Sequence, residues 1–208
     1  MIFAIVNSGM VIMNTKTILS AVISTLVFIT GLSQITVAQS QRVLNEAERI
    51  TGDKFTVSVK TPKGANVYAV KKPSSTVLNA IDQGLTDLFA VARKNRYNNR
   101  LNYSDYSVYI GKADRLKDSA GQYSPDIAVG AAQYAGSIYD QGGYIYAAGM
   151  VIANEPCSFV IAEHTKNFDR ISNVVRYEGE HLVLYHNDRR RYAATADHSK
   201  GGGHPILQ

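Results

Sequence analysis

The stretch PSSTVLNAIDQGLTDLFAVARKN, residues 73–95, decides the fold because it carries the strongest periodic pattern in the chain. Its apolar residues recur at steps of three and four, as on one face of an α-helix. They are Leu78, Ile81, Leu85, Leu88, Phe89 and Ala92. Ser74 or Ser75 can cap the first turn, and the basic residues before Asn95 suit the negative end of a helix dipole. The sequence therefore predicts a helix over residues 75–95.

Strand-like segments surround this helix on both sides. Residues 54–60 and 65–71 alternate apolar and polar side chains around Thr61-Pro62-Lys63-Gly64, which predicts a hairpin. Further strands are expected at 106–110, 144–153, 158–163, 172–177, 181–186 and 191–196. A short helix is expected over 41–50.

The short connections between the later strands favour antiparallel pairing. We therefore expect an α+β fold, in which an antiparallel meander of about five strands carries the 75–95 helix on one face, preceded by the N-terminal hairpin.

Length and composition narrow the class of protein. The chain has 208 residues, 45% hydrophobic and 19% charged, which excludes a disordered tail, a collagen and a repeat array. Its formal net charge of +5 favours anionic partners, such as RNA or another polyanion, without requiring them.

The first 38 residues resemble an export signal. Lys16 is the single charge among them, and a run of apolar and small hydroxyl residues follows it as far as Leu32. Thr36-Val37-Ala38 supplies small residues for cleavage. We expect a signal peptide at 1–38, translated from Met1 or Met13, and one mature domain at 39–208 that is secreted or periplasmic. The alternative is a membrane anchor.

The chain has one cysteine, Cys157, which cannot close a disulfide within the chain. Its neighbours resemble the start of a buried strand, so a buried structural thiol is favoured over a catalytic one. A lone thiol fits a bacterial exported protein better than a disulfide-rich secreted scaffold.

All five histidines lie in the last quarter of the chain. They are His164, His181, His186, His198 and His204. Acidic residues and the run Arg189-Arg190-Arg191 lie among them, so acid, base and cationic groups are expected at one end of the sheet. Histidines at strand ends can also be ordinary surface residues.

Three kinds of chemistry can be weighed for this cluster. No His-Glu-x-x-His or paired Cys-x-x-Cys spacing supports a metal site, and the alternative metal ligands would be His186, Asp188 and His204. No Gly-x-Ser-x-Gly motif supports a serine hydrolase. General acid–base cleavage of a phosphodiester fits the composition and needs no cofactor.

The segment from Leu184 to His198 resembles the C-terminal hairpin of the secreted microbial ribonucleases of the barnase type. In that family a Leu-Tyr strand ending in Asp turns into a strand that closes on Thr-x-Asp-His, as in Thr195-Ala196-Asp197-His198 here. The resemblance implies a metal-independent endoribonuclease with His198 as general acid.

The remaining site residues follow from that resemblance. Glu178 or Glu180 would be the general base, and Arg190 would complete the catalytic set. Arg176, Arg189, Arg191 and His204 would bind the substrate phosphates, although a Gly-rich tail around His204 can also be merely flexible.

A second class of function needs no catalysis. Tyrosine suits surfaces that bind proteins, glycans or single-stranded nucleic acid. The tyrosines crowd two neighbouring segments: Tyr97, Tyr103, Tyr106, Tyr109 and Tyr123 in the middle of the chain, and Tyr134, Tyr139, Tyr144 and Tyr146 in the Gly-rich segment that follows. An exported binding protein with a Tyr-rich surface, and a metal-dependent hydrolase built on the histidine cluster, are the alternatives.

Overall fold

The computed structural model describes residues 39–117, 119–133, 142–196 and 203–208, so the predicted signal peptide at 1–38 lies outside the described residues. The contacts within the chain divide it into two units, residues 1–40 and residues 41–208, and the fold described below is that of the second unit.

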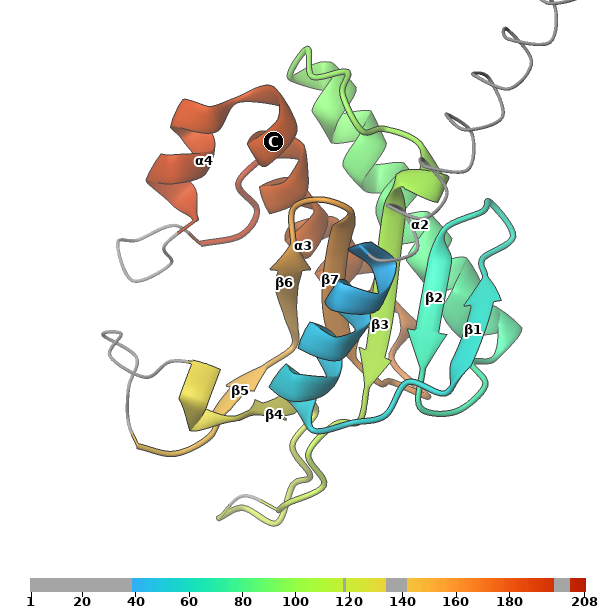
Figure 1. Ribbon diagram of the computed structural model, residues 1–208, viewed down its shortest axis with the longest axis vertical. Helices are drawn as coiled ribbons and strands as arrows, with labels where there is room; N and C mark the ends of the chain where they lie inside the picture. Colours follow the sequence, from blue (N-terminus) through green and yellow to red (C-terminus); the bar gives the residue numbers. More distant parts are fainter. Residues whose placement is uncertain (1–38, 118, 134–141, 197–202) are drawn as a thin grey trace, which may run out of the picture. The chain divides into compact units, whose positions relative to one another are not determined.

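A mixed five-stranded sheet forms the centre of the fold, in the order β1-β2-β3-β7-β6 (Figure 1). Its strands are β1 Val57–Lys60, β2 Asn66–Ala69, β3 Tyr106–Gly111, β7 Cys157–Ala162 and β6 Gly149–Ala153. β2, β3 and β7 are parallel, whereas β1 and β6 run antiparallel to their neighbours. A separate antiparallel pair joins β4 Ile127–Val129 to β5 Ile145–Ala147.

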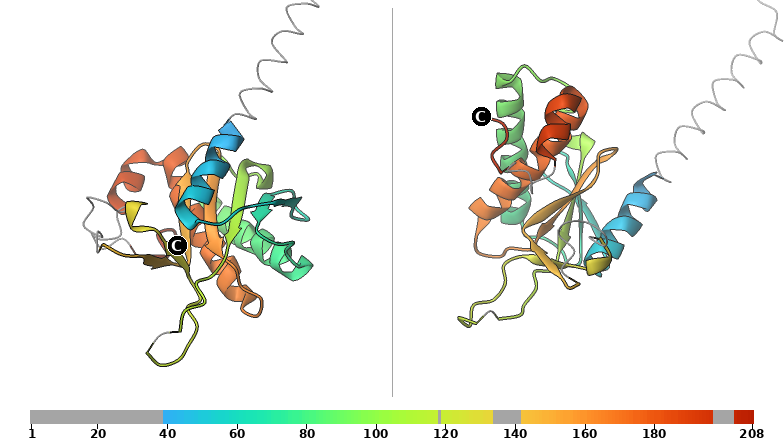
Figure 2. Two further views of the ribbon diagram at one scale, coloured as in Figure 1. Left: turned by 60° about the horizontal axis from the view of Figure 1, so that its bottom comes forward. Right: turned by 90° about the vertical axis from the view of Figure 1, so that its left-hand side faces the viewer.

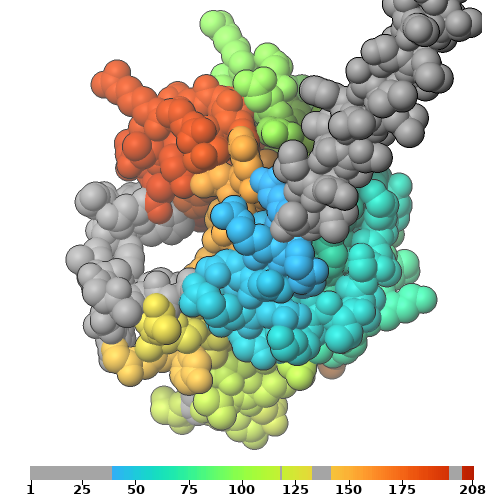
Figure 3. Space-filling model, in the orientation of Figure 1, coloured from blue at the N-terminus to red at the C-terminus, as the bar shows by residue number. Residues whose placement is uncertain are grey.

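Helices lie on both faces of the sheet. α2 Ser75–Lys94 and α3 Phe168–Asn187 pack together on one face, and the helix over residues 39–51 crosses the other. The right-hand view of Figure 2 shows these three layers, and Figure 3 shows residues 41–51 lying over the sheet. The shorter helices are η1 Tyr103–Asp105, η2 Ala131–Gln133 and α4 Arg189–Thr195.

The two central strands are buried on both faces because each face has its own helical cover. In β3, Val108 packs with the α2 and α3 cluster, whereas Tyr109 packs with the cluster of helix 39–51. In β7, Phe159 and Val160 alternate in the same way. Such strands have near-continuous apolar sequences, as parallel strands covered on both sides do.

Two glycines allow α2 and α3 to approach closely. A Cβ at Gly84 would overlap the backbone carbonyl of Ser172 and lie 2.8 Å from the Cβ of Val175. A Cβ at Gly179 would overlap the side chain of Leu88. Neither glycine marks a turn, because each lies within a helix at the contact.

Several predictions are confirmed by these elements. The α+β class, the 54–71 hairpin, the helix at 75–95 with Ser74 as its N-cap, and the short helix at 41–50 are all present. The strands expected at 106–110 and 158–163 are β3 and β7, each within one residue of the predicted bounds. The strand expected at 144–153 is two strands, β5 and β6, which belong to different sheets. Cys157 is buried as expected, and burial raises the pKa of its thiol to about 12.

The antiparallel meander is wrong. The strands predicted at 172–177 and 181–186 are one helix, α3, and the strand predicted at 191–196 lies mostly in α4. Glu178-Gly179-Glu180, the residues between these two predicted strands, lie inside α3. The core strands are parallel because α2 makes the long connection from β2 to β3 that parallel pairing requires.

No helix among the described residues is long and apolar enough to cross a membrane.

Candidate functional site

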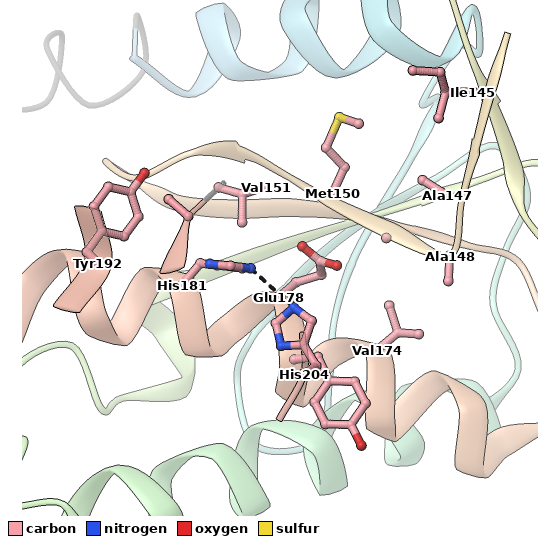
Figure 4. A pocket seen from close by; sticks show the side chains of 13 residues that line it. Ile145, Ala147, Ala148, Met150, Val151, Val174, Glu178, His181, Tyr192 and His204 are labelled. Atoms are coloured by element: carbon pink, nitrogen blue, oxygen red, sulfur yellow. Dashed lines mark hydrogen bonds between the residues drawn. The ribbon is translucent and has the colours of Figure 1, made fainter. Parts of the chain in front are cut away.

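A cavity of about 540 Å³ lies where β6, α3, the end of α4 and the C-terminal segment meet (Figure 4). One part of its lining is apolar and comes from the chain around β5 and β6, with Val174 of α3 opposite. These residues are Ile145, Ala147, Ala148, Gly149, Met150, Val151 and Val174. The polar lining consists of Tyr177, Glu178, His181, Tyr192 and His204.

The geometry of α3 brings three of these polar side chains together. His181 follows Glu178 by three positions and Tyr177 by four, so the three side chains lie on one face of the helix. Asn167 caps the helix by accepting a hydrogen bond from the backbone N–H of Arg170. The apolar residues Ile171, Val175 and Leu182 bury the neighbouring face in the core, which directs the polar face to the cavity.

Glu178 lies against the backbone of β6. A Cβ at Gly149 would lie 2.9 Å from its Cγ and 3.1 Å from its Oε1, so this glycine leaves the space that the carboxylate needs. Desolvation raises the pKa of Glu178 to about 7, and the charge of His204 opposes the rise. Near neutral pH, this carboxyl can therefore both accept and release a proton.

His181 and His204 are in contact on the cavity lining and share a hydrogen bond between their Nε2 atoms. Their Nε2 atoms are 3.2 Å apart, and the two rings are almost perpendicular, at 83° (Figure 4). The ring of Tyr177 stacks on His204, with centroids 5.1 Å apart. Because His204 comes from the C-terminal segment, the site forms only when that segment docks on α3.

Glu180 docks the C-terminal segment. Its carboxylate is fully buried, and Oε2 accepts hydrogen bonds from Nδ1 of His204 at 3.1 Å and from the backbone N–H of Ile206 at 2.7 Å. Arg176 lies 3.5 Å from the other carboxylate oxygen and donates to the carbonyl of Leu207. Glu180 therefore positions His204 and does not line the cavity.

The predicted phosphate-binding arginines lie outside the cavity and make other contacts. Arg176 and Arg191 hold the C-terminal segment by donating to the carbonyls of Leu207 and Ile206. Arg189 stacks over the ring of Tyr185, with its guanidinium carbon 3.3 Å from the ring centroid. Arg190 is exposed on α4. None of the described residues that line the cavity is an arginine or a lysine.

Two of the alternative metal ligands, His186 and Asp188, contact other residues and do not line the cavity. His186 bonds through Nε2 to the carbonyl of Asn154, and Asp188 caps α4 while accepting from Tyr97. Within the described residues, no group of three or more His, Cys, Asp or Glu side chains forms a metal centre. The predicted general acid, His198, lies outside the described residues.

The tyrosines of the middle segment belong mostly to the core. Tyr106 and Tyr109 are buried, and Tyr97 and Tyr103 pack against the main core cluster. The exposed tyrosines among the described residues include Tyr123, Tyr144 and Tyr146. The tyrosines of segment 97–109 are thus mostly core residues, whereas these three exposed tyrosines belong to the same expected set, and a Tyr-rich binding surface stays a prediction.

Sequence reasoning placed Glu178, Glu180 and His204 in the site but assigned no role to His181 or Tyr177. The missed signal is helical spacing, because a helix through 177–181 puts both beside Glu178, whereas a strand and turn separate them.

Comparisons with protein-family models, with curated proteins and with solved structures found no match for this chain.

Proposed function

We propose that the protein is an exported hydrolase that cleaves an uncharged acyl bond, an ester or a peptide bond next to an apolar group, in the cavity between α3 and β6. The observation that carries the proposal is the Glu178 carboxyl in a largely apolar cavity that His181 and His204 also line. An acid–base group beside two imidazoles is an arrangement that suits proton transfer.

The chemistry uses water as the second substrate. The water oxygen forms a bond to the acyl carbon while the Glu178 carboxylate takes a water proton. That proton then passes to the leaving oxygen or nitrogen as the acyl bond breaks, so atoms and charge balance. Nε2–H of His181 can donate a hydrogen bond to the acyl oxygen as negative charge develops on that oxygen.

The lining favours an uncharged substrate. Alanine, valine, isoleucine and methionine side chains dominate the walls, and the arginines expected to bind phosphate contact the C-terminal segment or solvent instead. A polyanion such as RNA needs cations at the cleaved bond. The ribonuclease resemblance rests on residues expected to form a hairpin, and those described, up to Ala196, lie in α3, in α4 and at the ends of these helices. Cleavage of RNA stays a prediction that the same assay can test.

The test is a substrate panel with matched variants. Purified protein would be given a peptide mixture, a series of chromogenic esters with acyl chains of increasing length, and single-stranded RNA. We expect cleavage of peptides or esters, with Glu178→Gln reducing the rate at least 100-fold. Asp87→Asn, a change of an exposed carboxylate on α2, is the control and should keep full activity.

Other outcomes would overturn the proposal. Cleavage of RNA alone would replace the acyl substrate with a phosphodiester. Equal activity of Glu178→Gln and wild type would move the reaction away from this cavity. If purified protein cuts nothing in the panel, the exported binding protein becomes the better account.

A further inference from the structure

The two imidazoles in the cavity are spaced as ligands of one ion would be. Zinc binds histidine nitrogen at about 2.0–2.1 Å in tetrahedral geometry, which places two ligating nitrogens ~3.3 Å apart. The Nε2 atoms of His181 and His204 are 3.2 Å apart and share a hydrogen bond, drawn as a dashed line in Figure 4. Their separation is therefore close to that of two ligands of one ion.

The hydrogen bonds of Glu180 prepare His204 for that role. Oε2 of Glu180 already accepts the backbone N–H of Ile206, so Nδ1 of His204 is the donor in its 3.1 Å contact with the same oxygen. In the neutral ring the proton is then on Nδ1 and the lone pair is on Nε2, which accepts the hydrogen bond from Nε2–H of His181. A cation bound between the two rings would replace that shared proton, with the remaining proton of His181 on Nδ1. A carboxylate behind a ligating histidine is the usual second partner at zinc sites, where it fixes the tautomer and the ring orientation.

From this geometry we propose that His181 and His204 bind a divalent cation of the zinc class through their Nε2 atoms, beside Glu178. Two ligands come from the described residues, among which no group of three or more His, Cys, Asp or Glu side chains forms. Water or substrate would occupy further positions on the ion. This inference rests on the proposed function, because the ion would act on the same bond by polarising the acyl oxygen or the attacking water.

The pair proposed here differs from the metal ligands suggested by sequence. His186 and Asp188 contact Asn154 and Tyr97 instead, so only His204 is common to both sets. His186 is therefore a matched control, because it is also a histidine of α3 with an Nε2 contact, but it does not line the cavity.

Metal binding can be measured apart from activity. Protein stripped with a chelator and dialysed would be titrated with Co²⁺ alone and with Zn²⁺ alone, following cobalt absorption and the equilibrium stoichiometry. We expect one ion per wild-type chain, binding at least tenfold weaker in His181→Gln and His204→Gln, and unchanged binding in His186→Gln. Glu180→Gln should weaken binding about 10–100-fold. Glu178→Gln should still bind.

A measurement on the wild type avoids variants that fail to fold. In protein labelled with ¹⁵N-histidine, Zn²⁺ should shift the Nε2 resonances of two histidines and leave their Nδ1 resonances protonated. The absence of stoichiometric binding by the wild type, or equal binding by His181→Gln and His204→Gln, would overturn the proposal.

The metal inference and the proposed function fail in different ways. Hydrolysis by a protein shown to contain no metal would overturn the ion and keep the hydrolase. Stoichiometric binding by a protein that cleaves no substrate would keep the ion and overturn the hydrolase.

Discussion

Replacing Glu178 by glutamine should stabilise the protein while inactivating it. The structure raises the pKa of this carboxyl from 4.5 to about 7 through desolvation, so the folded state disfavours its ionised form. At ~1.4 kcal/mol for each pKa unit, a rise of this size lowers the free energy of unfolding of the wild type by up to about 3 kcal/mol where the carboxyl is ionised. Glutamine keeps the shape of the protonated acid and carries no charge at any pH.

The sign of the effect depends on pH. Below about pH 4.5 the carboxyl is protonated in both folded and unfolded chains, so wild type and Glu178→Gln should have equal stability. As the pH rises from 4.5 through 7, the unfolded chain releases the proton more readily and the wild type loses stability. Above pH 7 the full difference of up to about 3 kcal/mol should favour the variant.

The assay is thermal and chemical unfolding at a series of pH values, with chelator present so that bound metal does not contribute. In a chain of this size, the variant should melt ~6–12 °C above the wild type at pH 8, and the gap should close toward pH 4.5. Asp87→Asn, the exposed control, should change stability by less than about 0.5 kcal/mol. If Glu178→Gln is no more stable than wild type at pH 8, or the gap does not depend on pH, the argument for a desolvated carboxyl fails.

Three further predictions concern the fold and the chain ends. Gly84→Ala should lower the free energy of unfolding by about 1–3 kcal/mol in chemical denaturation, because the new Cβ would overlap the backbone of Ser172. Helix propensity alone predicts a more stable variant, so a gain in stability would refute the α2–α3 contact. The thiol of Cys157, with its pKa raised to about 12 by burial, should react with an aromatic disulfide reagent only after unfolding, and fast labelling of native protein would contradict its place in β7. The exported protein should begin at Gln39, which intact-mass spectrometry of the protein recovered outside the cytoplasm can check, and an uncleaved chain in the membrane fraction would favour the anchor.

The first half of the fold could be predicted because local signals agree there. In residues 73–95 the serine cap, the apolar stripe and the terminal cations all indicate one helix. In the 54–71 hairpin the alternation and the turn residues agree in the same way. Consistent signals of this kind come from residues close together in the chain, which is what sequence patterns report.

The last quarter could not be predicted in the same way because its local signals conflict. Val174, Val175, Val183 and the tyrosines of α3 favour a strand, and Gly179 suggests a turn. The helix forms because Ile171, Val175 and Leu182 bury against α2 and the sheet, and because Gly179 admits Leu88. This tertiary packing outweighs β-propensity, and sequence spacing alone does not show it.

The same error explains what was found and missed at the site. Glu178 and Glu180 were expected to be alternatives for one general base. In α3 they are two positions apart, which places them on opposite sides of the helix. Glu178 therefore lines the cavity, and Glu180 is fully buried behind His204. The long-range contact of His204 with His181 has no signature in the sequence, since 23 residues separate them.

Hydrolysis in water enriched with ¹⁸O tests the central claim most directly. A peptide mixture incubated with the purified protein should yield new carboxyl ends that carry one solvent oxygen, detected by mass spectrometry as a 2 Da increase over products formed in ordinary water. Glu178→Gln should yield no such ends, and Asp87→Asn should match the wild type. The account is contradicted if the wild type yields no labelled product from peptides or from the ester series, or if Glu178→Gln labels the same ends at the same rate.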